Sequence, residues 1–177
     1  MKTAGILTIG NEILQGYTLD LNANRISAEL TKRNINVTIH LTVPDSIPKI
    51  SEKVEKFIQK DYDYVFITGG LGPTHDDVTR EALVKLFNKK LIFLEDRHKS
   101  LEEKYLKKTK KQKISKSQSK ILSNSKAIDN HAGTALGMLI QENNTEVVIL
   151  PGVPNEMNQM LLSYLDQQGF EGRSILY

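Results

Sequence analysis

Short runs of apolar residues recur along this chain, and each has the length and composition of a β-strand. Residues 4–9 form one such run, and residues 37–43 alternate apolar with polar side chains. Residues 64–68 and 147–150 are short, rich in β-branched residues and followed by glycine or proline, as buried strands of a parallel sheet are. A further run at 90–94 predicts an edge strand.

Between these runs, apolar residues recur every three or four positions, which places them on one face of a helix. Asp20 is placed to cap the first helix, and Ser46 and Pro48 mark the start of the second. Strands alternating with helices of this length predict a three-layer, doubly wound α/β fold with a mostly parallel sheet. The apolar positions of the four predicted helices are Leu19, Ala23, Ile26 and Leu30; Ile50, Val54, Phe57 and Ile58; Val78, Ala82, Leu83, Leu86 and Phe87; and Met157, Met160, Leu161 and Leu165.

A change of composition interrupts this alternation between residues 95 and 145, which we interpret as leaving the sheet. Residues 97–126 hold 11 of the 24 basic residues and 2 of the 21 acidic ones, so the rest has 13 basic and 19 acidic side chains and a net charge of −6. We interpret residues 1–177 as a single domain from which a basic helical excursion departs at about 95–126. Its lysine-rich part at 107–120 has no aromatic ladder or nucleic-acid motif, so a solvated helix face is favoured over a nucleic-acid partner.

The composition excludes several classes of protein. The chain has no cysteine, which excludes a disulfide framework, a thiolate nucleophile and a cysteine-based zinc site. Any bound metal must therefore be held by oxygen or histidine ligands. No apolar stretch is long enough to span a bilayer, so no membrane partner is expected and the cytoplasm is the default location.

The most informative segment for function is the glycine-rich loop after the strand at 64–68. Residues Gly69–Gly72 can bring backbone N–H groups close to a phosphate, and the following helix presents the positive end of its dipole to the same place. The loop ends in Asp76 and Asp77, which would repel a phosphate unless a divalent cation or a proton transfer takes part. This pattern predicts an active-site loop; the alternative is that Thr74 or Asp76 only caps the helix.

In a parallel sheet, the loops at the carboxyl ends of the strands share one edge, where a ligand crevice forms. Four such loops are expected to meet in this chain. Carboxylates gathered in one crevice raise one another's pKa values or recruit a cation such as Mg²⁺, although each acid could also be a helix-start or surface residue. The acidic residues brought together in this way are Glu12, Asp45, Asp76, Asp77 and Glu156.

Asp45 and Asp77 are the pair that we expect to be catalytic. Each lies at a strand-to-helix turn on the crevice edge, and hydrolysis of a phosphoanhydride needs one group to hold a metal and another to position water. We assign the metal to Asp76 and Asp77. Asp20 and Asn24, near the start of the first helix, could hydrogen-bond a purine, a pterin or a ribose.

Five separated blocks of sequence, in order, carry a family resemblance. They are Gly10-Asn11-Glu12-Ile13-Leu14 with Gly16, Asp20 and Asn24; residues 43–45; Thr68-Gly69-Gly70-Leu71-Gly72-Pro73-Thr74 with Asp76, Asp77 and Thr79; Asn130 with Gly133-Thr134-Ala135; and Leu150-Pro151-Gly152-Val153-Pro154 with Glu156 and Met157. Together they resemble the molybdopterin-binding domain of MogA and MoaB proteins and, more closely, the amino-terminal domain of CinA-like proteins. Such an ordered set is far more specific than one glycine motif. One departure is Leu136, where the family pattern usually has proline.

The resemblance implies a nucleotide or a pterin, including molybdopterin, as the ligand. CinA-like domains of this type are associated with metal-dependent cleavage of ADP-ribose and related dinucleotides, whereas MogA-like enzymes adenylylate molybdopterin with Mg-ATP. In MogA-like enzymes the catalytic aspartates match Asp45 and Asp77. A non-catalytic module that binds the pterin or nucleotide is the third possibility.

The same resemblance predicts a divalent metal, Mg²⁺ or Co²⁺, and a homo-oligomer, either a dimer or a trimer. CinA-like proteins commonly continue into a deamidase domain, for which this chain has no room, so deamidase activity is not expected. The residues expected to bind ligand or phosphate are Gly10, Asn11, Glu12, Asp20, Asn24, Gly69, Gly70, Leu71, Gly72, Thr74, Gly152 and Glu156.

Overall fold

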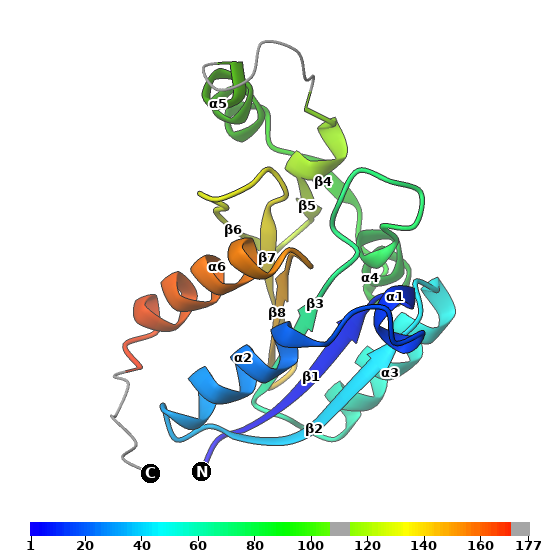
Figure 1. Ribbon diagram of the computed structural model, residues 1–177, viewed down its shortest axis with the longest axis vertical. Coiled ribbons are helices and arrows are strands. Elements are labelled where there is room, and N and C mark those ends of the chain that lie inside the picture. Colours follow the sequence, from blue (N-terminus) through cyan, green and yellow to red (C-terminus); the bar gives the residue numbers. More distant parts are fainter. Residues whose placement is uncertain (107–113, 171–177) are drawn as a thin grey trace.

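The computed structural model describes residues 1–106 and 114–170, in which helices cover both faces of a six-stranded sheet (Figure 1). Neighbouring strands β2, β1, β3 and β8 are parallel, whereas β7 and β6 continue the sheet antiparallel. The predicted α/β fold with a mostly parallel sheet is therefore confirmed. In sheet order the strands are β2 (Asn36–Val43), β1 (Thr3–Ile9), β3 (Tyr64–Thr68), β8 (Thr145–Leu150), β7 (Gly137–Glu142) and β6 (Lys126–Ile128).

Alternating side chains along the buried strands divide the core into two halves. Leu7 and Ile67 belong to the half covered by α3 (Ile47–Gln59) and α4 (Thr79–Phe87), whereas Ile6 and Phe66 belong to the half covered by α2 (Leu21–Thr31) and α6 (Pro154–Gln167). Every residue of β3 is buried, as expected of a strand with helices on both faces. This packing fixes the carboxyl ends of β1, β3 and β8 side by side.

The predicted helix starts hold, with one exception in the first helix. Asp20 caps α2, because its carboxylate accepts a hydrogen bond from the Ala23 N–H at 2.9 Å. Pro48 lies in the first turn of α3, and Ser46 precedes it without a side-chain cap. Leu19, however, was wrongly placed on the apolar face: it precedes α2 and is 80% exposed.

Two expectations about residues 90–145 are wrong. The strand near residue 90, β4 (Leu91–Phe93), pairs with β5 (Lys120–Leu122) in a separate two-stranded sheet and does not extend the edge of the main one. The chain also returns to the main sheet before residue 145, since β6 and β7 extend it beyond β8. The sequence pattern does not predict β6 or β7, because β6 has only three residues and the buried positions of β7 do not alternate with exposed ones.

The segment at about 95–126 is only partly helical. It contains α5 (Glu95–Leu106), the short 3-10 helix η1 (Lys116–Ser119) and β5, and the lysine-rich centre at 107–113 lies outside the described residues. We call α5, η1, β4 and β5 the head; in Figure 1 the head lies beyond one end of the main sheet. None of the helices in the described part of the chain is long and apolar enough to cross a membrane.

Two isoleucines on strands test which sheet holds the core. Ile67→Ala is expected to lower the free energy of unfolding by about 2–5 kcal/mol, because Ile67 is fully buried in the half of the core covered by α3 and α4. Ile92→Ala, in β4 at 45% exposure, should cost less than about 1 kcal/mol. Urea unfolding followed by circular dichroism measures both; equal losses would contradict the assignment.

Candidate functional site

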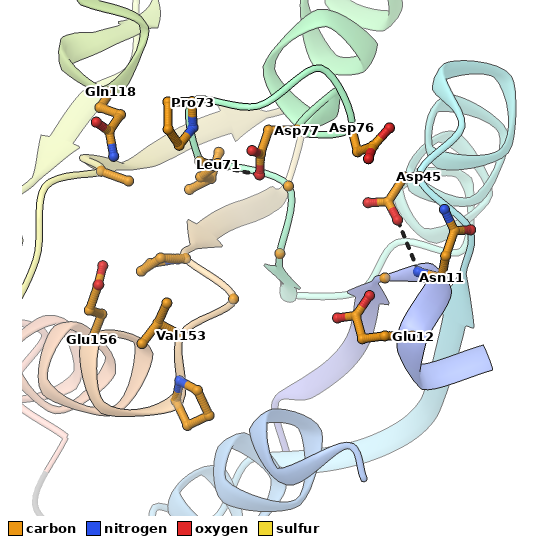
Figure 2. A pocket seen from close by; sticks show the side chains of 18 of the residues that line it. Asn11, Glu12, Asp45, Leu71, Pro73, Asp76, Asp77, Gln118, Val153 and Glu156 are labelled. Atoms are coloured by element: carbon orange, nitrogen blue, oxygen red, sulfur yellow. Dashed lines mark hydrogen bonds between the residues drawn. The ribbon is translucent and has the colours of Figure 1, made fainter. Parts of the chain in front are cut away.

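A cavity of about 760 Å³ lies at the carboxyl ends of the parallel strands (Figure 2). The loops after β1, β2, β3 and β8 border it, and the head adds Gln118. Asp45 and Asp77 line the same cavity, as the topology of the sheet predicts. All five acidic residues expected at this edge line it, namely Glu12, Asp45, Asp76, Asp77 and Glu156.

Asp45 is held at one side of the cavity by the start of α1 (Asn11–Leu14), whose Asn11 N–H donates to its Oδ2 at 2.9 Å. Partial burial raises the pKa of Asp45 above its ordinary value, and repulsion from the Glu12 and Asp76 carboxylates adds to this, while the Asn11 hydrogen bond opposes it. Figure 2 shows Asp76 and Asp45 at this side. We call Glu12, Asp45 and Asp76 the acidic side of the cavity.

Thr79, at the start of α4, fixes the first half of the glycine loop. The Thr79 hydroxyl donates to the Gly69 carbonyl at 2.8 Å, and the Thr79 N–H donates to the Gly70 carbonyl at 3.2 Å. Because the N–H and C=O of a trans peptide point in opposite directions, the N–H groups of Gly70 and Leu71 point away from Thr79. Within the described residues neither N–H has an acceptor, and both residues line the cavity. They are therefore available to an anion.

Glycine is required at both of these turns. The backbone φ is +107° at Gly69 and +66° at Gly70, in the region that L side chains rarely adopt. A Cβ at Gly69 would lie 2.2 Å from the Ile9 carbonyl oxygen, and one at Gly70 would lie 2.2 Å from the Thr79 hydroxyl. The loop is thus packed between the end of β1 and the start of α4.

Asp77 organises the far half of this loop. One carboxylate oxygen accepts the Gly72 N–H at 2.7 Å, and the other accepts the Thr74 N–H at 2.8 Å and the Thr74 hydroxyl at 2.5 Å. These bonds occupy three of its roughly four lone-pair positions, so Asp77 has little capacity left for a metal. The alternative that Thr74 or Asp76 caps the helix is contradicted, since α4 starts after Val78 with no side-chain cap from either residue.

The opposite side of the cavity is built around Glu156, in the first turn of α6. Its carboxylate accepts a hydrogen bond from the buried Asn130 side chain at 2.6 Å, and the Asn130 oxygen in turn accepts the Gly133 N–H at 2.7 Å. Gln118 of the head bonds Thr134 nearby through its side-chain amide. Figure 2 shows Gln118 and Glu156 across the cavity from Asp45, so a bound molecule would meet amide and carboxylate groups there.

Two functional candidates escaped the sequence interpretation. Asn22 of α2 is 6% exposed, and its side-chain amide donates to the Thr68 hydroxyl at 3.0 Å and to the Gly152 carbonyl at 2.8 Å, which ties two cavity loops together. Arg80, at 2% exposure, binds three backbone carbonyls beneath the glycine loop. Hydrophobic periodicity has no signal for either, because buried asparagine and arginine are exceptions to the rule that places polar residues outside.

Three expected ligand-binding residues do not line the cavity. Asp20 uses one carboxylate oxygen to cap α2 and pairs the other with His40 Nε2 at 2.8 Å. Asn24 is exposed on α2, and Thr74 is exposed and bonded to Asp77. The other expected residues line the cavity; they are Gly10, Asn11, Glu12, Gly69, Gly70, Leu71, Gly72, Gly152 and Glu156.

The described residues contain no group of three His, Asp or Glu side chains close enough to hold a metal ion by themselves. Mg²⁺ usually binds through one or two carboxylates, with waters and substrate phosphates completing its octahedron. The acidic side fits that mode, since Asp45 and Asp76 are near enough to repel one another beside the free N–H groups of the loop. Of the two aspartates assigned to a metal from the sequence, Asp76 is better placed than Asp77.

Comparisons with known proteins agree with this architecture. Residues 5–168 match a family model described as a probable molybdopterin binding domain. A CinA-like protein of Pseudothermotoga lettingae is 36% identical over 169 residues, which cover 94% of this chain and 41% of that protein. The chain spans 38% to 63% of the length of curated relatives that it matches.

Solved structures give the same result. A CinA protein of unknown function from Thermoplasma acidophilum superimposes with a TM-score of 0.83 at 33% identity, covering 94% of this chain and 97% of the other. The molybdopterin biosynthesis enzyme MoaB from Thermus thermophilus superimposes with a TM-score of 0.66 at 22% identity, covering 94% and 91%. The second likeness shows the fold alone.

Two glycines with similar backbone angles test the packing of the loop. Gly16 has a φ of +75° with nothing within 4 Å of an added Cβ, so Gly16→Ala should cost only the backbone strain of about 1–2 kcal/mol. Gly70→Ala adds a clash with Thr79 and should cost about 3 kcal/mol or more. Urea unfolding of both variants measures the difference; equal costs would show that Thr79 does not confine Gly70.

The raised pKa of Asp45 predicts a pH-dependent gain in stability for Asp45→Asn. A carboxyl with a native pKa above its unfolded value favours folding below the unfolded pKa and loses that contribution as the pH rises through the native pKa. Asp45→Asn should therefore raise the melting temperature at about pH 7 and leave it nearly unchanged at about pH 3. Calorimetry at both pH values measures this, with Glu55→Gln as the control, since Glu55 is exposed on α3 and has no ion pair within the described residues. An equal effect of Asp45→Asn at both pH values would contradict the prediction.

Proposed function

Because this chain belongs to the molybdopterin-binding domain family, on its CinA-like side, we propose that it is a metal-dependent nucleotide pyrophosphatase acting on ADP-ribose or a related dinucleotide. One observation carries the proposal: the free N–H groups of Gly70 and Leu71 line the same cavity as the carboxylates of Asp45 and Asp76. A diphosphate beside a divalent cation satisfies both sets of groups at once.

The glycine loop supplies hydrogen-bond donors for the diphosphate. Gly70 and Leu71 offer backbone donors, and α6 begins at the cavity with Pro154, so that the positive end of its dipole faces an anion bound there. These groups attract a negatively charged ligand, and no flexible side chain has to be ordered when it binds. The diphosphate is therefore bound by rigid backbone, which reduces the entropy lost on binding.

The acidic side supplies the position for the cation, which we assign to Asp76 with help from Glu12. When bound, a divalent ion neutralises the charge that develops on the phosphoryl oxygens. Without it, the carboxylates of the acidic side would oppose the diphosphate. Mg²⁺ and Co²⁺ both accept oxygen ligands of this kind.

Asp45 is suited to the proton transfer of hydrolysis. Water adds to one phosphorus, the bridging P–O bond breaks, and ADP-ribose yields AMP and ribose 5-phosphate. The proton released by the attacking water passes to Asp45, whose raised pKa makes it a stronger base than an ordinary aspartate. Asp77 contributes indirectly, because its hydrogen bonds to Gly72 and Thr74 hold the loop in shape.

A second candidate function is the adenylylation of molybdopterin by ATP. It is favoured by the family model, which describes molybdopterin binding, and by the fold shared with the biosynthesis enzyme MoaB. The same loop would hold the phosphates of ATP. The formation of adenylylated pterin from Mg-ATP and molybdopterin separates this function from hydrolysis.

Incubation with ADP-ribose and Mg²⁺ or Co²⁺, followed by chromatography for AMP, tests the leading proposal. Asp45→Asn should lower AMP formation at least about 100-fold, the usual contribution of a general base. Asp76→Asn should raise the metal concentration that gives half-maximal rate by about tenfold. Asp166→Asn, on the exposed end of α6, should leave both quantities unchanged.

The outcomes separate the three functions. No AMP with either metal, or full activity in Asp45→Asn, would rule out the hydrolase. Binding of ADP-ribose without turnover would indicate a non-catalytic module. Adenylylated pterin without AMP from ADP-ribose would indicate the transferase.

A further inference from the structure

Arg80 is an unusual arginine, because the residue is only 2% exposed and all of its hydrogen bonds to described residues go to backbone carbonyls. Nη1 donates to the Leu71 carbonyl at 2.9 Å, Nε to the Lys120 carbonyl at 3.0 Å and Nη2 to the Leu136 carbonyl at 3.5 Å. These carbonyls belong to the glycine loop, to the start of β5 and to the turn before β7. One side chain thus joins three segments that are far apart in sequence.

The Leu71 bond has a direct consequence for the cavity. The peptide between Leu71 and Gly72 is held at both ends, its carbonyl by Arg80 and its N–H by Asp77 at 2.7 Å. The preceding carbonyls are held by Thr79. Arg80 therefore completes the set of contacts that keeps the N–H groups of Gly70 and Leu71 free for a ligand.

The positive charge of Arg80 also affects the cavity. Within the described residues Arg80 forms no salt bridge, although the Asp77 and Glu81 carboxylates lie near enough to influence it. Burial lowers the pKa of Arg80 to about 10, so it stays protonated at neutral pH. A buried cation that is not ion-paired favours an anion on the other side of the thin glycine loop.

We propose that Arg80 is the positioning residue of the glycine loop. Its planar guanidinium fixes the Leu71 carbonyl, the head and the turn at Leu136 in one arrangement. Its positive charge favours the bound diphosphate. This rests on the proposed phosphate-binding role of the loop. Lysine cannot replace arginine here, because an ammonium group lacks the fork that reaches carbonyls in three directions.

Arg80→Lys is the informative variant, because it keeps the charge and removes the fork. Hydrogen–deuterium exchange of the free protein should become about tenfold faster in residues 68–77 and 134–137, since loss of a charge-assisted hydrogen bond is worth about that factor. Affinity for inorganic pyrophosphate with Mg²⁺, measured by calorimetry at 25 °C, should fall by about tenfold as well. Arg80→Met should bind pyrophosphate more weakly still if it folds, since it also lacks the charge.

Arg33→Lys is the matched control. Arg33 also has a buried side chain that donates to backbone carbonyls, those of Glu29 and Phe170, but it follows α2 at the amino ends of the strands. The Arg33→Lys variant should have a lower melting temperature, with unchanged affinity for pyrophosphate and unchanged hydrogen–deuterium exchange in residues 68–77. A purely structural role for Arg80 would give the same pattern as this control.

The outcomes are distinguishable from those of the proposed function. If the parent binds pyrophosphate and Arg80→Lys binds it equally, Arg80 is not a positioning residue, whereas the hydrolase proposal stands. If the parent does not bind pyrophosphate, the proposed function fails, and the exchange experiment alone decides whether Arg80 fixes the loop. Unchanged exchange in residues 68–77 of Arg80→Lys overturns the inference in either case.

Discussion

The pair of hydrogen bonds from Thr79 to the Gly69 and Gly70 carbonyls is the constraint on which the site depends. Two consecutive carbonyls are bound at the start of one helix, so the N–H groups that follow them must point away from it. The fold makes this possible by placing the end of β1 and the start of α4 on either side of the loop, with room for glycine alone. Because Thr79 binds the carbonyls of this loop, the N–H groups that follow them are left available to bind a ligand.

Burial of charged groups at the site costs electrostatic free energy, which the packing of the rest of the domain offsets. Asp45 has a raised pKa because it is partly buried beside Glu12 and Asp76, and Arg80 is buried without an ion pair to any residue that the structure describes. Each would be more stable in water. Perturbed groups of both signs around one cavity are typical of functional sites, where a ligand and its cation complete the charge balance. The stable two-sided core provides the free energy that such an arrangement requires.

Much of this could be predicted from the sequence because it follows from topology. Strands at the right places in a parallel sheet bring Asp45, Asp77 and Glu156 to one edge whatever the details of packing. The role of Asp77 could not be predicted, since nothing in the pattern shows that its oxygens are used by Gly72 and Thr74. The contribution of Gln118 was hidden for a similar reason, because it lies in a lysine- and serine-rich stretch with no periodicity.

The contacts of Leu136 show that the head forms part of the site. The family pattern usually has proline at this position, which has no N–H, whereas the Leu136 N–H donates to the Gln118 carbonyl at 2.9 Å. The Leu136 carbonyl accepts from Arg80, which also holds Leu71. One residue therefore connects the head to the glycine loop through both of its backbone groups. A displacement of the head would move Gln118 and loosen the Leu71 carbonyl together, so the two sides of the cavity are mechanically coupled.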